Sequence, residues 1–347
     1  MLNVSKNEFY KLWNVRYNKP LSTGAAGGNT DVFLYNDNTG LDQRWLIIPL
    51  DDGTFMVANK ADGNVLATTT GEGGAFVYRP LDTTDQHWIN VDVGNGNFQV
   101  RNHKFGKNLA TNGGNVFLYD PLDATVTDQQ WRVAPIESFS LPSLPNVSPE
   151  DPVPSFISDG NIASSTPERT IGAMHMPYVM VNDGWSTKEQ INSTPYYVAE
   201  HRTHWIRVAI HVLPAYTKYS TSTTTGISKT SQIDIENTLS IKISPSAEFS
   251  IFGIGFSLKE EIQEQLKVHY TSSTTEMTTT TTSVEFNNTS GHDVDMAAFI
   301  RVHRIITKRA DGSSVLDISY QDPNSLSIVS HVRSDQKSNP IPFPGDC

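Results

Sequence analysis

The sequence predicts an all-β protein of two regions, residues 1–135 and 156–347, joined by a proline-rich linker at residues 136–155. The first region contains the tetrapeptide Asp-Gln-x-Trp three times, and each copy begins 43 residues after the previous one. The second region is rich in Thr, Ser, Val and Ile, which favour strands, and contains a long alternation of apolar and polar residues. Five prolines between positions 142 and 154 exclude both helix and ladder pairing from the linker.

The three repeats predict a closed, three-lobed barrel. A period near 40 residues, made of short apolar runs and Gly, Asn and Asp turns, leaves no room for a helix in each repeat. We expect the repeated Trp to pack in the barrel core and the repeated Gln to hydrogen-bond nearby backbone, since buried polar groups need partners. These structural residues are Gln43, Trp45, Gln86, Trp88, Gln129 and Trp131.

At these residues the chain resembles the ricin-B type β-trefoil lectins, whose repeats carry Gln-x-Trp. Sugar binding needs an aromatic face for the apolar side of the ring and a carboxylate or amide for its hydroxyls. Each repeat offers one such set, namely Tyr35 with Asp42, Tyr78 with Asp85, and Tyr119 with Asp128. The resembled lectins have a further Asp early in the repeat, where this chain has Thr23, Thr68 and Thr111. A protein receptor is therefore the competing ligand of the same loops.

Composition excludes several other functions. A net charge of −11 argues against a nucleic-acid partner and against attachment to lipid through basic residues. The only cysteine is Cys347, so no intramolecular disulfide or cysteine-built metal site is expected. No secretory signal, apolar stretch of 18 residues, nucleophile elbow or nucleotide loop is apparent. We therefore expect no enzyme, cofactor, metal site or transmembrane helix.

Residues 233–266 form a candidate membrane hairpin between two Ser/Thr-rich tracts, at 217–231 and 271–283. Alternation over this stretch predicts two amphipathic strands, each long enough to cross a bilayer. The turn falls at Ser244-Pro245-Ser246 or at Gly253-Ile254-Gly255. Two alternatives stay open: ordinary half-buried sheet strands, and a short helix capped from Ser257. The apolar face comprises Leu239, Ile241, Ile243, Phe249, Ile251, Phe252, Ile254, Phe256 and Leu258.

Two segments, 177–183 and 190–198, followed by His204-Trp205, resemble the signature stretch of the binary-toxin-like insecticidal crystal proteins of spore-forming bacilli. That family pairs a trefoil with an elongated, aerolysin-like pore-forming domain. The resemblance implies storage as a sporulation crystal, proteolytic activation, binding to a receptor or glycan on gut cells, and homo-oligomeric pores in the lipid bilayer, in some members with a second toxin component. The C-terminal tail is expected to be loose, with cleavage after Arg333 or Lys337. The alternatives are a lectin that does not perforate membranes and a glycan hydrolase.

Overall fold

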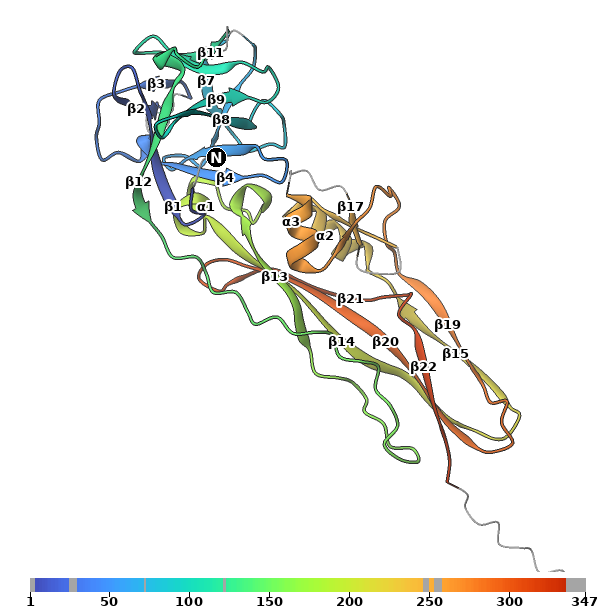
Figure 1. Ribbon diagram of the computed structural model, residues 1–347. Coiled ribbons are helices and arrows are strands. Elements are labelled where there is room, and N and C mark those ends of the chain that lie inside the picture. Colours follow the sequence, from blue (N-terminus) through green and yellow to red (C-terminus); the bar gives the residue numbers. More distant parts are fainter. Residues whose placement is uncertain are drawn as a thin grey trace, which may run out of the picture.

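The computed structural model is elongated, with a rounded N-terminal part at one end and a long, narrow sheet extending from it (Figure 1). The structure describes residues 4–24, 30–71, 73–120, 123–245, 250–252 and 258–334. Within these residues no helix is both long and apolar enough to cross a membrane.

The N-terminal part is a β-trefoil of short antiparallel strands. Strand β1 pairs with β12, which closes the barrel between the two ends of the repeat region, and β4, β8 and β12 each follow a Gln-x-Trp step. The strands are β1 Glu8–Asn14, β2 Lys19–Thr23, β3 Val32–Leu34, β4 Trp45–Pro49, β5 Phe55–Asn59, β6 Val65–Thr68, β7 Ala75–Tyr78, β8 Trp88–Gly94, β9 Asn97–Asn102, β10 Asn108–Thr111, β11 Val116–Tyr119 and β12 Trp131–Ser138, with single helical turns η2 Leu41–Gln43 and η3 Thr127–Gln129.

The three repeated tryptophans lie at the centre of the trefoil core and are fully buried. Each indole N–H donates to a backbone carbonyl two strands earlier in the chain, to Leu21 (3.0 Å), Leu66 (3.0 Å) and Leu109 (2.9 Å) respectively. Because a buried indole needs a hydrogen-bond acceptor, this one contact fixes both the depth and the orientation of each ring.

After β12 the chain runs along the second region as an extended strap without regular secondary structure. The strap is held at several points: Ser148 N–H donates to the Thr170 carbonyl (2.8 Å), and the Trp205 indole donates to the Asp151 carbonyl (2.9 Å). Proline cannot donate to a ladder, so these scattered bonds take the place of strand pairing.

The second region is built on a long antiparallel sheet in the order β13-β14-β20-β21, with β22 also paired to β20. Strands β14 and β20 pair from Val198↔Lys308 to Leu213↔Val294 and form the spine of the molecule. Its elements are β13 Arg169–Pro177, η4 Tyr178–Met180, α1 Thr187–Ser193, β14 Tyr196–Leu213, β15 Lys218–Thr225, α2 Lys229–Leu239, β16 Lys242–Ser244, β17 Ser250–Phe252, α3 Lys259–Leu266, β18 His269–Tyr270, β19 Thr280–Asn287, β20 Val294–Lys308, β21 Ser314–Gln321 and β22 Ser327–Val332.

The two Ser/Thr-rich tracts pair with each other. Strands β15 and β19 form a separate two-stranded antiparallel ribbon, in register from Lys218↔Asn287 to Thr225↔Thr280. One face packs on the spine through buried Val284 and Phe286, while most of the Ser and Thr side chains remain exposed. The ribbon therefore combines a buried apolar face at one end with a polar surface along its length.

The prediction of two long strands over residues 233–266 is wrong for this structure. Helices α2 and α3 cover the two ends of that stretch, and among its described residues β16 and β17 alone pair antiparallel, with Ser244 opposite Ser250. Residues 246–249 and 253–257, on which the two predicted turn positions partly fall, lie outside the described residues. The helices prevail because Ile235 and Leu239, like Leu258, Ile262 and Leu266, have helical spacing and bury one stripe, whereas a lone hairpin exposes its apolar face.

A second hydrophobic core joins the two regions. It includes Phe9, Leu46 and Ile48 of the trefoil together with Met174 and Tyr178 of the second region. The Tyr178 hydroxyl donates to the Gly63 carbonyl (2.6 Å), and Gly63 approaches Thr187 so closely that an added Cβ would lie 2.1 Å from its carbonyl oxygen. Together with the positive φ of Gly63, this approach requires glycine there.

Candidate receptor-binding face and membrane segment

Three exposed tyrosines lie at the end of the trefoil that points away from the second region, and we call them the tyrosine cap. Tyr35, Tyr78 and Tyr119 are 54%, 46% and 49% exposed and lie at the ends of β3, β7 and β11. Backbone hydrogen bonds connect these strands to the neighbouring repeats, from Leu34 N to Gly114 O (2.7 Å) and from Val77 N to Thr30 O (2.8 Å). Each tyrosine also meets a Phe of its own strand edge-on, at 6.2–6.3 Å between ring centroids. The tyrosine cap thus presents three aromatic rings to solvent, each held by a neighbouring ring.

The repeated aspartates lie in the tight turns before the tryptophans, and their backbone carbonyls are held in the same way in every repeat. The carbonyls of Asp42, Asp85 and Asp128 each accept a side-chain amide N–H at 2.9 Å. Their carboxylates differ. Asp85 lies 3.8 Å from Lys104 and Asp128 lies 3.3 Å from Arg16, whereas Asp42 folds over the backbone of Gly40.

The repeated glutamines are buried and hydrogen-bonded. The Gln43 amide donates to the Asn36 carbonyl (2.8 Å) and its oxygen accepts from Asn38 N–H (3.0 Å). Gln86 makes the equivalent pair of bonds to Arg79 O and from Leu81 N, and the Gln129 oxygen accepts from Asn108.

The three threonines at the position of the lectin aspartate are also buried. Thr23, Thr68 and Thr111 are at most 2% exposed, and the hydroxyls of Thr68 and Thr111 donate to backbone carbonyls at 3.0 and 2.8 Å. These three side chains therefore lie in the interior and not at the surface of the trefoil.

The candidate membrane hairpin, residues 233–266, belongs to a longer segment, residues 226–279, that connects the two strands of the ribbon. The described parts of this segment, including α2 and α3, lie in the angle between the trefoil and the spine (Figure 1). Its apolar side chains Leu239, Ile241, Ile243 and Leu258 are at most 5% exposed and belong to the core that joins the two regions. Phe249, Ile254 and Phe256 lie outside the described residues; Ile251 and Phe252 are on β17, where only the backbone is described.

Polar contacts hold α3 at both ends. Of the alternatives left open, the short helix is the one found here, but its N-cap is Leu258 rather than Ser257, and the trefoil supplies the acceptor. The Asp51 carboxylate accepts the first helical amides, from Glu260 N (2.7 Å) and Glu261 N (3.4 Å), which satisfies N–H groups that have no partner within a helix. The sequence gives no local signal for this contact, because 209 residues separate Asp51 from Glu260.

At its C-terminal end α3 rests on a buried histidine of the spine. The Leu266 carbonyl accepts from His201 Nδ1–H at 2.8 Å, and the other nitrogen, Nε2, lies 2.8 Å from Nδ1 of His303. Burial, reinforced by the neighbouring His303, lowers the pKa of His201 to about 3, so the ring is neutral. Gly172 touches the same carbonyl end: an added Cβ would lie 2.5 Å from the Leu266 carbonyl carbon.

Comparison with known proteins gives relatives for this arrangement. The chain is 28% identical over 184 residues to the binary larvicide subunit BinA of Lysinibacillus sphaericus, covering 52% of this chain and 49% of BinA. It is 26% identical over 212 residues to the insecticidal crystal protein Cry35Ab1 of Bacillus thuringiensis, covering 58% and 55% of the two chains. The chain thus spans about half the length of the curated relatives it matches.

The likeness in structure extends further than the likeness in sequence. The crystal structure of Cry35Ab1 superposes with a TM-score of 0.82 over 94% of this chain and 90% of that chain, at 21% sequence identity. No family model matches the chain. Over the superposed 94% of the chain, the trefoil and the elongated sheet therefore have the fold of the Cry35Ab1 structure.

Proposed function

We propose that the chain is an insecticidal toxin that perforates cell membranes, because it resembles BinA and Cry35Ab1 in sequence and Cry35Ab1 in fold. In this proposal the trefoil binds a glycan or protein receptor on the target cell. Residues 226–279 then leave their site beside the spine and extend the β15–β19 ribbon into the lipid bilayer. Several copies complete the pore together.

The observation that carries the proposal is the ribbon itself. Strands β15 and β19 form a sheet of only two strands, and residues 226–279 interrupt them at one end. If that segment becomes extended, its alternating residues prolong the ribbon by two strands with one apolar face. A membrane strand needs about 9–11 residues, apolar toward lipid and polar toward water, and the segment is long enough for two such strands.

Oligomerisation follows from the unpaired edges of the ribbon. Each outer edge presents N–H and C=O groups that water satisfies at the surface but lipid cannot, at several kcal/mol per group. Edges paired with neighbouring copies leave no such group exposed. The exposed Ser and Thr side chains then face the water-filled interior, where polar residues cost nothing.

For the receptor-binding step, the tyrosine cap is the surface that we assign. Aromatic rings that are held rigidly and half exposed stack on sugars and also anchor protein interfaces at low entropic cost. The relatives named as binary subunits support a second toxin component as a further partner.

A fluorescence experiment tests insertion directly. In a Cys347→Ser background, a single cysteine replaces Ile233, which is 45% exposed on α2, and carries an environment-sensitive dye. A matched variant carries the dye at Lys188 on α1, which the proposal keeps outside the membrane. We expect the dye at position 233 to become accessible to a lipid-phase quencher on target membranes and the dye at position 188 to stay in water.

Conductance across a planar bilayer is recorded on the same protease-treated samples, with the chain alone and with a second component. Ion leakage while the position 233 dye remains open to an aqueous quencher would show that another segment forms the pore. Binding and cell clumping without leakage would make the protein a lectin.

A further inference from the structure

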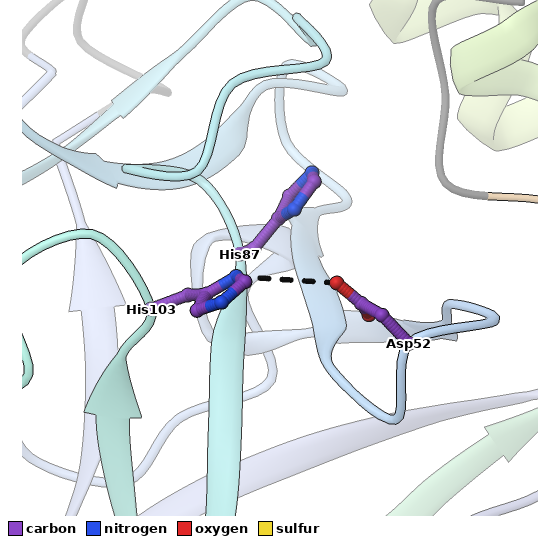
Figure 2. A group of neighbouring side chains, drawn as sticks. All are labelled: Asp52, His87 and His103. Atoms are coloured by element: carbon purple, nitrogen blue, oxygen red, sulfur yellow. Dashed lines mark ion pairs between the residues drawn. The ribbon is translucent and has the colours of Figure 1, made fainter.

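Three turns of the trefoil bring one carboxylate and two imidazoles together (Figure 2). Asp52 lies in the turn between β4 and β5, His87 directly precedes β8, and His103 directly follows β9. One ligand atom from each of the three lies within 4.8 Å of the others, and His103 Nδ1 is 3.9 Å from Asp52 Oδ2. The two rings are nearly parallel, with centroids 6.4 Å apart.

In the part of the chain that the structure describes, His87 is buried in the trefoil without a hydrogen-bond partner that would account for its polar ring. Its side chain is 3% exposed, yet neither ring nitrogen has a hydrogen-bond partner among the described residues. Nε2 lies 3.4 Å from Asp82 Oδ1, beyond good hydrogen-bond geometry. A buried polar group without a partner destabilises a fold by about 1–3 kcal/mol, so a ligand that binds the ring recovers that loss.

Asp52 is held in an orientation that leaves one oxygen available. Its Oδ1 accepts two hydrogen bonds from Thr54, one from the backbone N–H (3.0 Å) and one from the hydroxyl (2.5 Å). Oδ2 is then the oxygen that faces His103. Burial by itself would raise the pKa of Asp52, but the Thr54 hydrogen bonds and the two nearby imidazoles bring that pKa below its usual value. The carboxylate is therefore an anion at neutral pH.

The first repeat shows what these positions do when they hold fixed charges. The residues 43 positions before the two histidines are Arg44 and Lys60, and both form ion pairs with Glu137, the former at 2.5 Å. Two cations of the first repeat thus bind one carboxylate from β12. The second repeat offers imidazoles instead, and a neutral imidazole, unlike Lys or Arg, is a metal ligand. A metal cation bound between the two imidazoles and the Asp52 carboxylate would supply the positive charge that Arg44 and Lys60 supply to Glu137.

We propose that Asp52, His87 and His103 bind a divalent transition-metal ion of the Zn²⁺ class. Two imidazole nitrogens and one carboxylate oxygen are a ligand set that such ions prefer, with a fourth position for water. Bond lengths of about 2.0–2.2 Å require the ligand atoms to draw together. His103 and Asp52 can do so, because their side chains are 41% and 37% exposed, while His87 is fixed in the interior.

Asp82 has a supporting role in this site. A histidine that binds metal through one nitrogen commonly donates its other N–H to a carboxylate, which fixes the orientation of the ring. Asp82 Oδ1 stands 3.4 Å from Nε2 of His87, so in this proposal Nδ1 is the nitrogen that binds the ion. The metal would also stiffen the turn between β4 and β5. Asp51, the neighbour of Asp52 in that turn, accepts a hydrogen bond from the start of α3, so metal binding would help to hold the helix.

Metal titration of the full chain, stripped with a chelator, tests the site. We expect one equivalent of Co²⁺ to bind with the visible absorption of a low-symmetry site, and Zn²⁺ to displace it. Mg²⁺ should bind to the parent chain no more tightly than it binds to the site variants. Asp52→Asn and His103→Gln should lose this binding, and Asp82→Asn should weaken it by about 10–100-fold. The matched control is His331→Gln, which removes an exposed histidine paired with Asp159 at 3.1 Å and should bind like the parent.

A charge-bridge variant separates loss of metal from loss of fold. His87→Arg, His103→Lys and Asp52→Glu together recreate the residue types of the first repeat. This variant should melt at or above the temperature of the metal-free parent and show no rise in Tm with Zn²⁺, whereas the parent Tm should rise. The proposal is overturned if the parent binds no stoichiometric Co²⁺ or Zn²⁺, or if Asp52→Asn and His103→Gln bind as tightly as the parent.

Discussion

Acidification is expected to loosen α3 from the spine, because the helix end rests on a histidine that stays neutral at acidic pH only while it is buried. Burial, together with the neighbouring His303, lowers the pKa of His201 to about 3, whereas a solvated imidazole has a pKa of about 6.5. The undocked state therefore takes up a proton first. Docking is at full strength above about pH 6.5 and weakens as the pH falls from there toward 3.

The size of the effect follows from this difference in pKa. At pH 5, an undocked state in which His201 is solvated gains about 2 kcal/mol relative to the docked state, or roughly 30-fold in their ratio. The hydrogen bond to the Leu266 carbonyl makes α3 the element that moves. His303 of β20 stacks on the His201 ring, and Tyr320 of β21 and Asp322 in the turn that follows contact His303 in turn, so these three groups do not belong to the helix that leaves.

Hydrogen exchange measures this directly. The amides of α3 should exchange faster at pH 5 than at pH 8 after correction for intrinsic rates, while amides at the centre of β14 and β20 stay protected. In His201→Gln, whose amide can donate to Leu266 but does not titrate, the pH dependence should disappear. His204→Gln, on the same strand, is the control and should retain it. Equal protection of α3 at both pH values in the parent chain would refute the reasoning.

Three further predictions concern other contacts. Asp51→Ala removes both acceptors at the start of α3 and should raise helix exchange by the equivalent of about 0.5–2 kcal/mol without changing the trefoil, as read by hydrogen exchange. Trp88→Phe leaves the buried Leu66 carbonyl without its donor and should lower the free energy of unfolding by about 1–3 kcal/mol in a urea titration. Tyr78→Ala, at an exposed position, should change stability by less than about 0.5 kcal/mol but weaken adhesion to target cells, scored by flow cytometry.

The trefoil could be predicted because its information is local and repeated. A Trp and a Gln at the same step of each repeat report the same buried environment three times, and turn residues between short apolar runs exclude helices. The aromatic cap was also predictable, since Tyr35, Tyr78 and Tyr119 follow the same apolar triplet. What the repeat could not give is the surroundings of Thr23, Thr68 and Thr111, because burial depends on the packing of all three lobes.

The segment between the Ser/Thr tracts could not be predicted, because its sequence satisfies two periodicities at once. Leu258, Ile262 and Leu266 lie on one face of a strand and on one face of a helix. Long-range contacts decide between helix and strand. The most important are the hydrogen bonds to the Asp51 carboxylate and the packing of the helices on the core that joins the two regions. The same limit applies to the cluster of Asp52 and His103, whose members come from separate turns and share no motif.

The core that spans both regions has a consequence for protein engineering. Chimeras that graft the trefoil of one relative onto the body of another would cut through a continuous interior and leave Tyr178 without its acceptor at Gly63. A workable exchange must carry η4 and α1 with the trefoil. Because the same core also contains side chains of α2 and α3, a force applied to a receptor-bound trefoil would reach these helices directly and not through a flexible linker.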